Sequence, residues 1–303
     1  MPKLSVDRPP ASRQASRPHV VDLATWPFVV GTSLGIYWIA TEAGQLSPDL
    51  AVLAQFTYLV GLIYALEQIR PYHPEWNVYD GQLKNDLIYN ITFPAAQLLA
   101  TVVSLYLLRV LAGDQQEPPW PAWPAHWPLL AQLLILVPLL DLVFYSVHRA
   151  FHSSPRLWRV HSIHHSSLQL HIVNNARLHP FEVAATFAPV VLLVHLIGVP
   201  LEVFGYFLAF QQAVGLMTHG NVRVRTGRLG LLLNTPEQHH WHHSRLPEEG
   251  NRNFGSVTMI WDHVFRSFLR PASRLASPDI GTDTPVPDGF AAQMIAPLQR
   301  PSR

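Results

Sequence analysis

The chain of 303 residues contains no cysteine. This absence excludes disulfides, thiolate zinc sites and cysteine-ligated iron–sulfur clusters, and it leaves the redox compartment undefined. Charged residues make up only 14% of the chain, and a formal net charge of +1 excludes nucleic-acid binding driven by bulk positive charge. Any metal or nucleophile chemistry must therefore use histidine, carboxylate or hydroxyl side chains.

Hydrophobic residues make up 49% of the sequence, and the mean hydropathy of +0.13 lies on the membrane side of the soluble average. Four apolar runs approach the roughly 20 residues that a spanning helix needs. They cover residues 26–43, 50–66, 87–111 and 127–147. Two shorter runs, 181–197 and 201–217, are separated only by the sequence GVP and predict a short membrane hairpin. The expected fold is all-α, a multi-pass transmembrane bundle of four long helices plus this hairpin.

The distribution of cations predicts the orientation. Of the 21 Lys and Arg residues, all but Arg109 lie before residue 26, in 70–84, in 149–177 or after His219. This positive-inside pattern places both termini and the histidine-rich segments on the cytoplasmic side, in a bacterial inner membrane or the endoplasmic reticulum. The first run has no cleavage site of small residues and is followed at once by another apolar run, so it predicts an anchor and not a removable signal peptide.

Both ends of the chain differ in composition from the rest. Residues 1–25 predict a disordered cytoplasmic N-terminus, and the Pro-rich residues 271–303 predict a disordered tail. Residues 26–270 are expected to form a single membrane domain.

Seventeen histidines are present, and nine of them are clustered. Most of the nine are spaced three or four residues apart, which places side chains on one face of a helix. The nine are His148 and His152 in HRAFH, His161, His164 and His165 in HSIHH, His219 in THGN, and His239, His242 and His243 in HHWHH. Each cluster can offer ring nitrogens to a common ion, so the sequence predicts a histidine-rich metal site.

Nine imidazoles exceed the ligands that one ion accepts, so the count predicts two metal ions. Nitrogen ligands suit iron, copper, zinc or nickel and disfavour magnesium and calcium. Two alternatives stay open: a cluster that senses pH, and a two-zinc hydrolase, although the motifs contain none of the usual bridging carboxylates. Five isolated histidines are interpreted as rings at a membrane interface: His19, His73, His126, His195 and His263. His171 and His240 lie near the clusters but are not counted as ligands.

Asp141 lies inside the fourth apolar run and shares a helix face with Tyr145 and His148. A carboxylate in a spanning helix is costly and usually has a partner. We expect this partner to be a ring N–H of a ligand histidine. The alternative is that Asp141 caps local backbone or faces water.

The ordered set of segments HRAFH, HSIHH, NNARLHPFE, THGN, TPEQHHWHH and NRNFGSVTMIWDHVF resembles the fatty acid hydroxylase and sterol desaturase superfamily. The resemblance is strongest over residues 85–270. Two departures are visible: Arg266 and Ser267 replace the family's usual Gly-Thr, and His240 adds a histidine to the last cluster.

The resemblance implies a membrane di-iron oxygenase whose cytoplasmic helical cap binds two iron ions through the nine histidines. It implies a reaction that uses dioxygen and two external electrons to hydroxylate or desaturate a lipid from the bilayer. The electrons would come from a cytochrome b5-like or ferredoxin/reductase partner. Within NNARLHPFE, His179 and Glu182 are expected beside the metal ligands, with a role as a tenth ligand the alternative for His179. Asn175 and Asp262 are weaker candidates for a place beside the ligands.

A divalent-metal transporter and a di-zinc membrane hydrolase remain alternatives at this point. A transporter would place polar residues at mid-membrane on several helices, whereas the spanning runs contain little besides Asp141. Measurement of the bound metal would distinguish the di-zinc hydrolase from the di-iron oxygenase. The lipid, the carbon attacked and the choice between alcohol and alkene stay open.

Overall fold

The computed structural model describes residues 19–78, 80–112, 118–271 and 275–299. Within them the regular elements are helices, accompanied by three isolated β-bridges. The α-helices are α1 (Val20–Trp38), α2 (Pro48–Ile69), α3 (Leu83–Ala112), α4 (Leu129–Ser153), α5 (Pro155–His165), α6 (Pro180–Ile197), α7 (Leu201–Thr218), α8 (Pro236–His242), α9 (Pro247–Gly250), α10 (Ile260–Val264) and α11 (Phe290–Ile295).

Five helices among the described residues are long and apolar enough to cross a membrane, which confirms the all-helical membrane fold. Four of them correspond to the four long apolar runs. The fifth is α6, one arm of the predicted hairpin, and α7 returns beside it. The first helix begins at Val20, six positions before the predicted start, because His19 and Asp22 form a capping box that nucleates it earlier.

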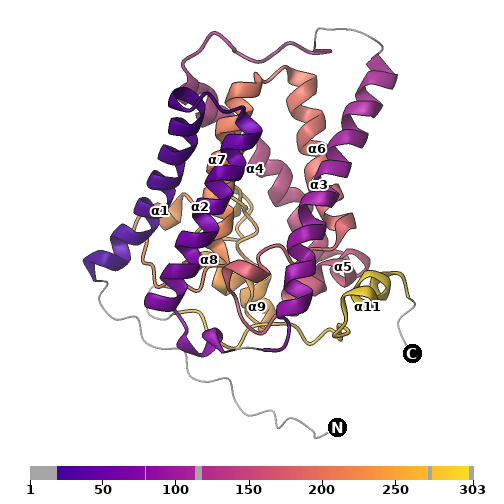
Figure 1. Ribbon diagram of the computed structural model, residues 1–303. Coiled ribbons are helices and arrows are strands. Elements are labelled where there is room, and N and C mark those ends of the chain that lie inside the picture. The colour runs from indigo at the N-terminus through magenta and orange to yellow at the C-terminus, as the bar shows by residue number, and fades with distance from the viewer. Residues whose placement is uncertain (1–18, 79, 113–117, 272–274, 300–303) are drawn as a thin grey trace, which may run out of the picture.

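The long helices run from one end of the molecule to the other (Figure 1). The connections from α1 to α2, from α3 to α4 and from α6 to α7 lie at the upper end in this view. The beginning of α1, and α5, α8, α9 and α11, lie at or near the opposite end. The arrangement therefore has one end made of connections between the long helices and one end built into a folded cap.

The sharp turn between α6 and α7 depends on the sequence GVP. Gly198 adopts a positive φ of 77°, where a Cβ atom would lie 2.8 Å from the ring of Pro118. Pro200 then precedes the first turn of α7. A glycine that tolerates left-handed geometry and a proline that ends the connection keep the two helices antiparallel.

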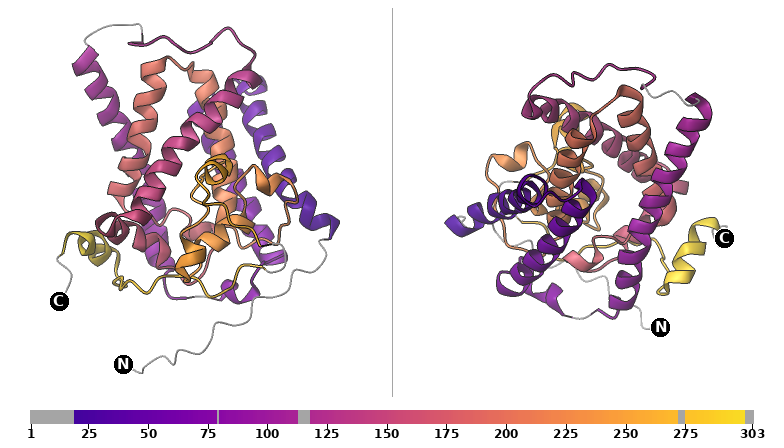
Figure 2. Two further views of the ribbon diagram at one scale, coloured as in Figure 1. Left: turned by 180° about the vertical axis from the view of Figure 1, so that it is seen from behind. Right: turned by 45° about the horizontal axis from the view of Figure 1, so that its top comes forward.

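The chain after α8 does not lie wholly outside the spanning bundle, which differs from the expectation for residues after His219. The indole nitrogen of Trp261 in α10 donates to the carbonyl of Pro138, a residue inside α4, at 2.8 Å. Figure 2 shows the orange chain after α8 rising beside the spanning helices. Val264 and Phe265 are 58% and 46% exposed. These apolar side chains are therefore exposed at the level of a spanning helix.

The C-terminal segment also differs from the expectation. Over the described residues 275–299 the chain is packed on the cap and contains α11 instead of being disordered. Tyr89 in α3 donates to the side chain of Gln293 at 2.7 Å, and Arg159 in α5 donates to the carbonyl of Ala296 at 2.7 Å. Composition missed this because the anchoring groups lie on other elements. Residues 1–18 of the predicted disordered N-terminus are outside the described residues, and 20–25 are helical.

Candidate metal centre

The nine clustered histidines converge at the cap end of the bundle. They form two groups whose candidate ligand atoms lie within 4.8 Å of one another. The five-histidine group contains His148, His152, His161, His165 and His242, and the four-histidine group contains His164, His219, His239 and His243. The structure thus brings together the predicted set, and it divides both HSIHH and HHWHH between the two groups.

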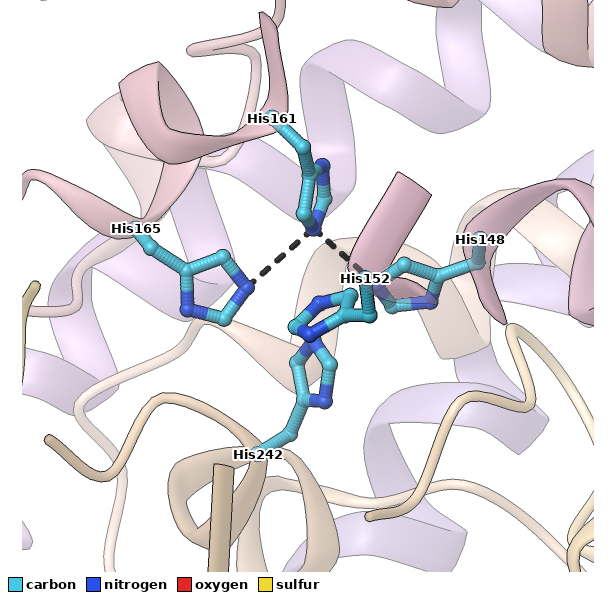
Figure 3. Close-up of side chains that lie close together, drawn as sticks. All are labelled: His148, His152, His161, His165 and His242. Carbon is cyan, nitrogen blue, oxygen red and sulfur yellow. Dashed lines mark hydrogen bonds between the residues drawn. The ribbon is translucent and has the colours of Figure 1, made fainter. Parts of the chain in front are cut away.

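Each group is assembled from different helices. The end of α4 provides His148 and His152, one turn apart, and α5 provides three rings after a sharp turn at Ser154. The C-terminus of α7 contributes His219, and α8 contributes the last cluster. In Figure 3 the rings of the five-histidine group point toward a common centre from α4, α5 and α8.

The distances between ring nitrogens fit metal ligation. The Nε2 atoms of His148 and His165 each lie 3.1 Å from Nε2 of His161. In the four-histidine group the Nε2 atoms of His164 and His219 are 3.2 Å apart. Two imidazole nitrogens bound at about 2.1 Å to one ion are separated by about 3.0 to 3.4 Å, depending on the angle at the metal.

Burial supports the same interpretation. The Nε2 atoms of His152 and His242 are buried and have no hydrogen-bond partner among the described residues. Burial lowers the pKa of His161 and His165 well below the usual value, with neighbouring histidines adding to the effect, and lowers that of His164 to about 3. These rings are therefore neutral at neutral pH and retain a lone pair for a metal ion.

A single loop orients three rings of the five-histidine group. The Nδ1 atoms of His148 and His242 donate to the carbonyls of Phe254 and Arg252 at 2.9 and 2.7 Å. Nδ1 of His152 lies 3.0 Å from the side-chain oxygen of Asn251. With the proton held on Nδ1, Nε2 is left free to bind a metal. These acceptors lie in NRNF, the start of the segment NRNFGSVTMIWDHVF through which the chain resembles the family. The spacing of the histidines did not predict them.

Asp262 holds this loop in place. Its carboxylate accepts the backbone N–H groups of Phe254 and Gly255 at 2.9 and 2.8 Å and the hydroxyl of Ser267 at 2.6 Å. Gly255 fits because a Cβ atom there would lie 1.9 Å from the carbonyl oxygen of Thr258. The weak candidate Asp262 is therefore a positioning residue that acts through the loop carbonyls.

Asp141 has a different partner from the one predicted. Its carboxylate accepts the backbone N–H groups of Ser256, Val257 and Thr258 at 2.8 to 3.1 Å, and the Thr258 hydroxyl at 2.6 Å. The predicted bond to a ligand histidine is wrong because Asp141 lies two helical turns, about 10 Å, before His148. The alternative of backbone capping is the one found, although the capped backbone is distant in sequence.

The LHPFE segment contains one residue at the metal centre and one at its edge. Glu182 accepts Nδ1–H of His161 at 2.5 Å, which supports its predicted place beside a ligand. His179 is absent from both groups; its Nδ1 caps the start of α6 by accepting from Phe181, and its Nε2 lies 3.3 Å from the carbonyl of Met294. Asn175 donates to the carbonyl of Gly215 at 2.9 Å and so ties its loop to α7.

The four-histidine group has weaker supports. Nδ1 of His164 lies 3.3 Å from the carbonyl of Arg177, and Nδ1 of His219 lies 3.3 Å from the side-chain oxygen of Asn174. The Nδ1 atoms of His239 and His243 are buried without a hydrogen-bond partner among the described residues. The sequence did not single out Asn174, although it lies in the NNARLHPFE segment.

Comparison with known proteins identifies the family. Residues 133–267 match the fatty acid hydroxylase family. The chain is 34% identical over 247 residues to the ornithine lipid hydroxylase OlsE of Rhizobium tropici, covering 80% of this chain and 74% of that protein. The chain belongs to the fatty acid hydroxylase superfamily. It is therefore an oxygen-dependent oxidoreductase that acts on lipids.

More distant members of the superfamily include the alkylglycerol monooxygenases. That of Caenorhabditis elegans is 29% identical over 154 residues, which cover 48% of this chain and 28% of that protein. The human protein is 28% identical over 149 residues, covering 48% of this chain and 32% of that protein. No solved structure matches the chain.

In this superfamily member a cavity of about 320 Å³ opens against both histidine groups. His148 and His161 from one group, and His164, His219 and His239 from the other, contribute to its wall. The far part is lined by apolar side chains of the spanning helices, among them Phe56, Phe93, Phe187 and Leu208. Both candidate metal positions thus border one space that is also lined by apolar side chains.

His240, the additional histidine of the last cluster, lies outside both groups. Its ring packs edge-on against Tyr72 and Trp76 with centroid distances of 4.9 and 5.2 Å. Burial lowers the pKa of His240 to about 3. This departure from the family pattern is therefore part of the packing between α8 and the chain that follows α2.

Proposed function

We propose that this chain is a membrane di-iron oxygenase that hydroxylates a lipid bearing a polar head. The observation that carries the proposal is that all nine histidines form two adjacent groups, both facing one apolar cavity. The relatives' names support hydroxylation over desaturation, because they describe an ornithine lipid hydroxylase and alkylglycerol monooxygenases. Bound iron would supply the oxygen-activating redox chemistry, which an all-imidazole donor set suits.

The overall reaction balances with two external electrons. One oxygen atom of dioxygen enters a C–H bond of the lipid to give an alcohol, and the other leaves as water with two protons. The five-histidine group would hold one ion and the four-histidine group the other. Glu182 and the loop carbonyls of residues 252 and 254 fix the rings so that Nε2 faces the ion.

Electrons would come from a separate donor, a cytochrome b5-like protein or a ferredoxin with its reductase. The cation distribution favours a cytoplasmic position for the cap and both termini. A donor on that side would approach the histidine groups from the end of the molecule opposite the connections between the long helices. The apolar part of the cavity would meanwhile receive the lipid from the bilayer.

The proposal is tested with purified protein in nanodiscs made from total membrane lipid. Iron-loaded protein supplied with oxygen and a reducing system should add one oxygen atom to a subset of lipids, and elemental analysis should find two iron ions per chain. The zinc-loaded protein is the matched control and should add none. Lipid hydrolysis by the zinc-loaded protein, with no oxygen added by the iron-loaded protein, would instead establish a di-zinc hydrolase.

A further inference from the structure

On the helices that line the cavity, three polar side chains have no hydrogen-bond partner among the described residues. They are Gln97 in α3, Thr186 in α6 and Gln211 in α7. Among the described residues, none of the three side chains makes a hydrogen bond, whereas the neighbouring Gln212 donates to the carbonyl of Val52 at 3.1 Å and to Gln55 at 3.3 Å. Gln212 therefore has a structural partner, and the other three have unused hydrogen-bonding capacity.

The hydroxyl of Thr186 differs from those of threonines elsewhere in the spanning helices. Thr32, Thr57 and Thr101 each donate to the backbone carbonyl four residues earlier, at 2.7, 2.9 and 3.0 Å. A threonine in a helix commonly satisfies its hydroxyl in this way. Thr186 does not within the described structure, so its hydroxyl remains available to a molecule in the cavity.

An amide without a partner is unfavourable in an apolar membrane environment. The three groups come from three helices that enclose one space, so a ligand with hydrogen-bonding atoms can satisfy all of them at once. Glutamine offers both a donor and an acceptor, and threonine offers a hydroxyl. This combination matches a carboxamide or an ester carbonyl and has no counterpart in a plain hydrocarbon chain.

The polar groups lie close to the histidine groups along the helices. Thr186 lies one helical turn, about 6 Å, beyond Glu182, which contacts His161, and Gln211 lies about 12 Å before His219 along α7. Val52 and Phe56 line the cavity from α2, and the carbonyl of Val52 accepts from Gln212, so α2 passes at the level of these polar groups. Polar and apolar side chains thus line the cavity side by side at this level.

We propose that Gln97, Thr186 and Gln211 bind the amide or ester linkage of the lipid substrate. This inference rests on the proposed hydroxylation and specifies its substrate class. The linkage carbonyl accepts from the glutamine amides, and the acyl chain lies against the apolar side chains of the same cavity. The lipid is thereby held by its linkage beside the histidine groups.

Binding tests the inference without turnover. Native mass spectrometry of the iron-loaded protein, without reductant, is carried out with an N-acyl amino acid, its ester-linked counterpart and an alkane of equal chain length. The amide should bind at least about tenfold more tightly than the alkane, since several hydrogen bonds separate the two ligands. The ester arm shows whether the N–H of the linkage is required.

Variants locate the effect. Gln97→Leu, Gln211→Leu and Thr186→Val should each weaken amide binding and leave alkane binding unchanged. Thr57→Val is the matched control, because the Thr57 hydroxyl is satisfied by its own helix and its side chain is exposed outside the cavity. Thermal melting and iron content verify that each variant folds, and the wild-type comparison of amide with alkane needs no variant.

The two proposals fail in different ways. If no membrane lipid gains oxygen but the amide preference and its loss in the variants are found, the hydroxylation proposal is wrong and the binding inference stands. If lipids are hydroxylated but alkane and amide bind equally, or the variants bind like the wild type, the inference is overturned.

Discussion

The two histidine groups share the same ring chemistry but differ in what holds the rings. In the five-histidine group, three Nδ1 atoms lie 2.7 to 3.0 Å from the loop of residues 251–254, and a fourth donates to Glu182. In the four-histidine group, the two supported rings have contacts of 3.3 Å, and the Nδ1 atoms of His239 and His243 have no partner among the described residues. One group is oriented by hydrogen bonds, and the other mainly by packing.

The two groups do not differ in access from the cavity, because both contribute to its wall. They differ in how rigidly the histidine rings are held. Two buried carboxylates, Asp141 and Asp262, hold consecutive parts of the loop that supports the five-histidine group. A ligand whose orientation is fixed by such outer contacts binds its metal more tightly and more specifically. We therefore expect the two sites to respond differently to substitution.

Substitution of adjacent histidines should produce the largest effect. His243→Ala leaves three rings in its group and should lose that ion, whereas His242→Ala leaves four and should retain its ion more weakly. Both should abolish activity because each group needs its full set of rings. Elemental analysis should give about one metal per chain for His243→Ala and up to two for His242→Ala. The control His240→Leu should retain two, and loss of both ions in either variant would show that the groups are not separate.

Asp141→Asn and Asp262→Asn should affect only the five-histidine group. Asparagine preserves the shape but directs an N–H toward backbone N–H groups that need an acceptor, so the loop loses its anchor. We expect activity to fall about 10- to 100-fold, as is typical when outer contacts of ligands are lost. A chelator should then remove one ion per chain faster than from the wild type. Equal acceleration of both ions would contradict the separation of the sites.

Asn174→Ala should have a smaller effect, and on the other group. It removes the neutral contact of 3.3 Å to His219, a bond of a kind that contributes about 0.5 to 1.5 kcal/mol. It also removes the side-chain hydrogen bonds to the backbone N–H of His171, the hydroxyl of Ser167 and the carbonyl of Gln169, so thermal melting is measured alongside activity. Activity should fall severalfold, with chelator loss accelerated for the ion of the four-histidine group. A decrease as large as that of Asp262→Asn would show that the weak contacts position this group as strongly as the loop positions the other.

The smallest functional effect is expected from cysteine labelling, which tests where the supporting loop lies. The chain has no native cysteine, so single cysteines can be introduced at Ala122, Glu248 and Val264, all exposed. An impermeant maleimide should label position 122 in intact cells and position 248 only in opened membranes. Position 264 should resist it in both cases because lipid surrounds it.

The labelling experiment has two informative contrary results. Labelling of position 248 in intact cells would invert the orientation and remove the cap from cytoplasmic electron donors. Rapid labelling of position 264 in opened membranes would show that α10 faces water, and the loop that supports the five-histidine group would then lie outside the bilayer. Activity should remain close to that of the wild type in all three variants.

Local patterns accounted for much of the molecule. Run length predicted the spanning helices, and spacings of three and four residues selected eight of the nine histidines that meet at the cap end, all but His219. Glu182 was found through the resemblance to the family, and its contact with His161 agrees with the expected position. Composition was a poor guide to the C-terminal segment, because Gln293 and its neighbours are held by polar groups on α3 and α5.

The sequence by itself determined that this chain is a helical membrane protein with a multi-histidine centre, because helix length and side-chain spacing are local properties. Only the tertiary structure decided which histidines share a group, which atoms orient their rings and which side chains line the cavity. Asp141 and Thr258 illustrate the reason: they are 117 positions apart, and their bond exists only because α10 and its loop pack against α4. Contacts between such distant segments depend on the packing of the whole bundle, and no short pattern encodes them.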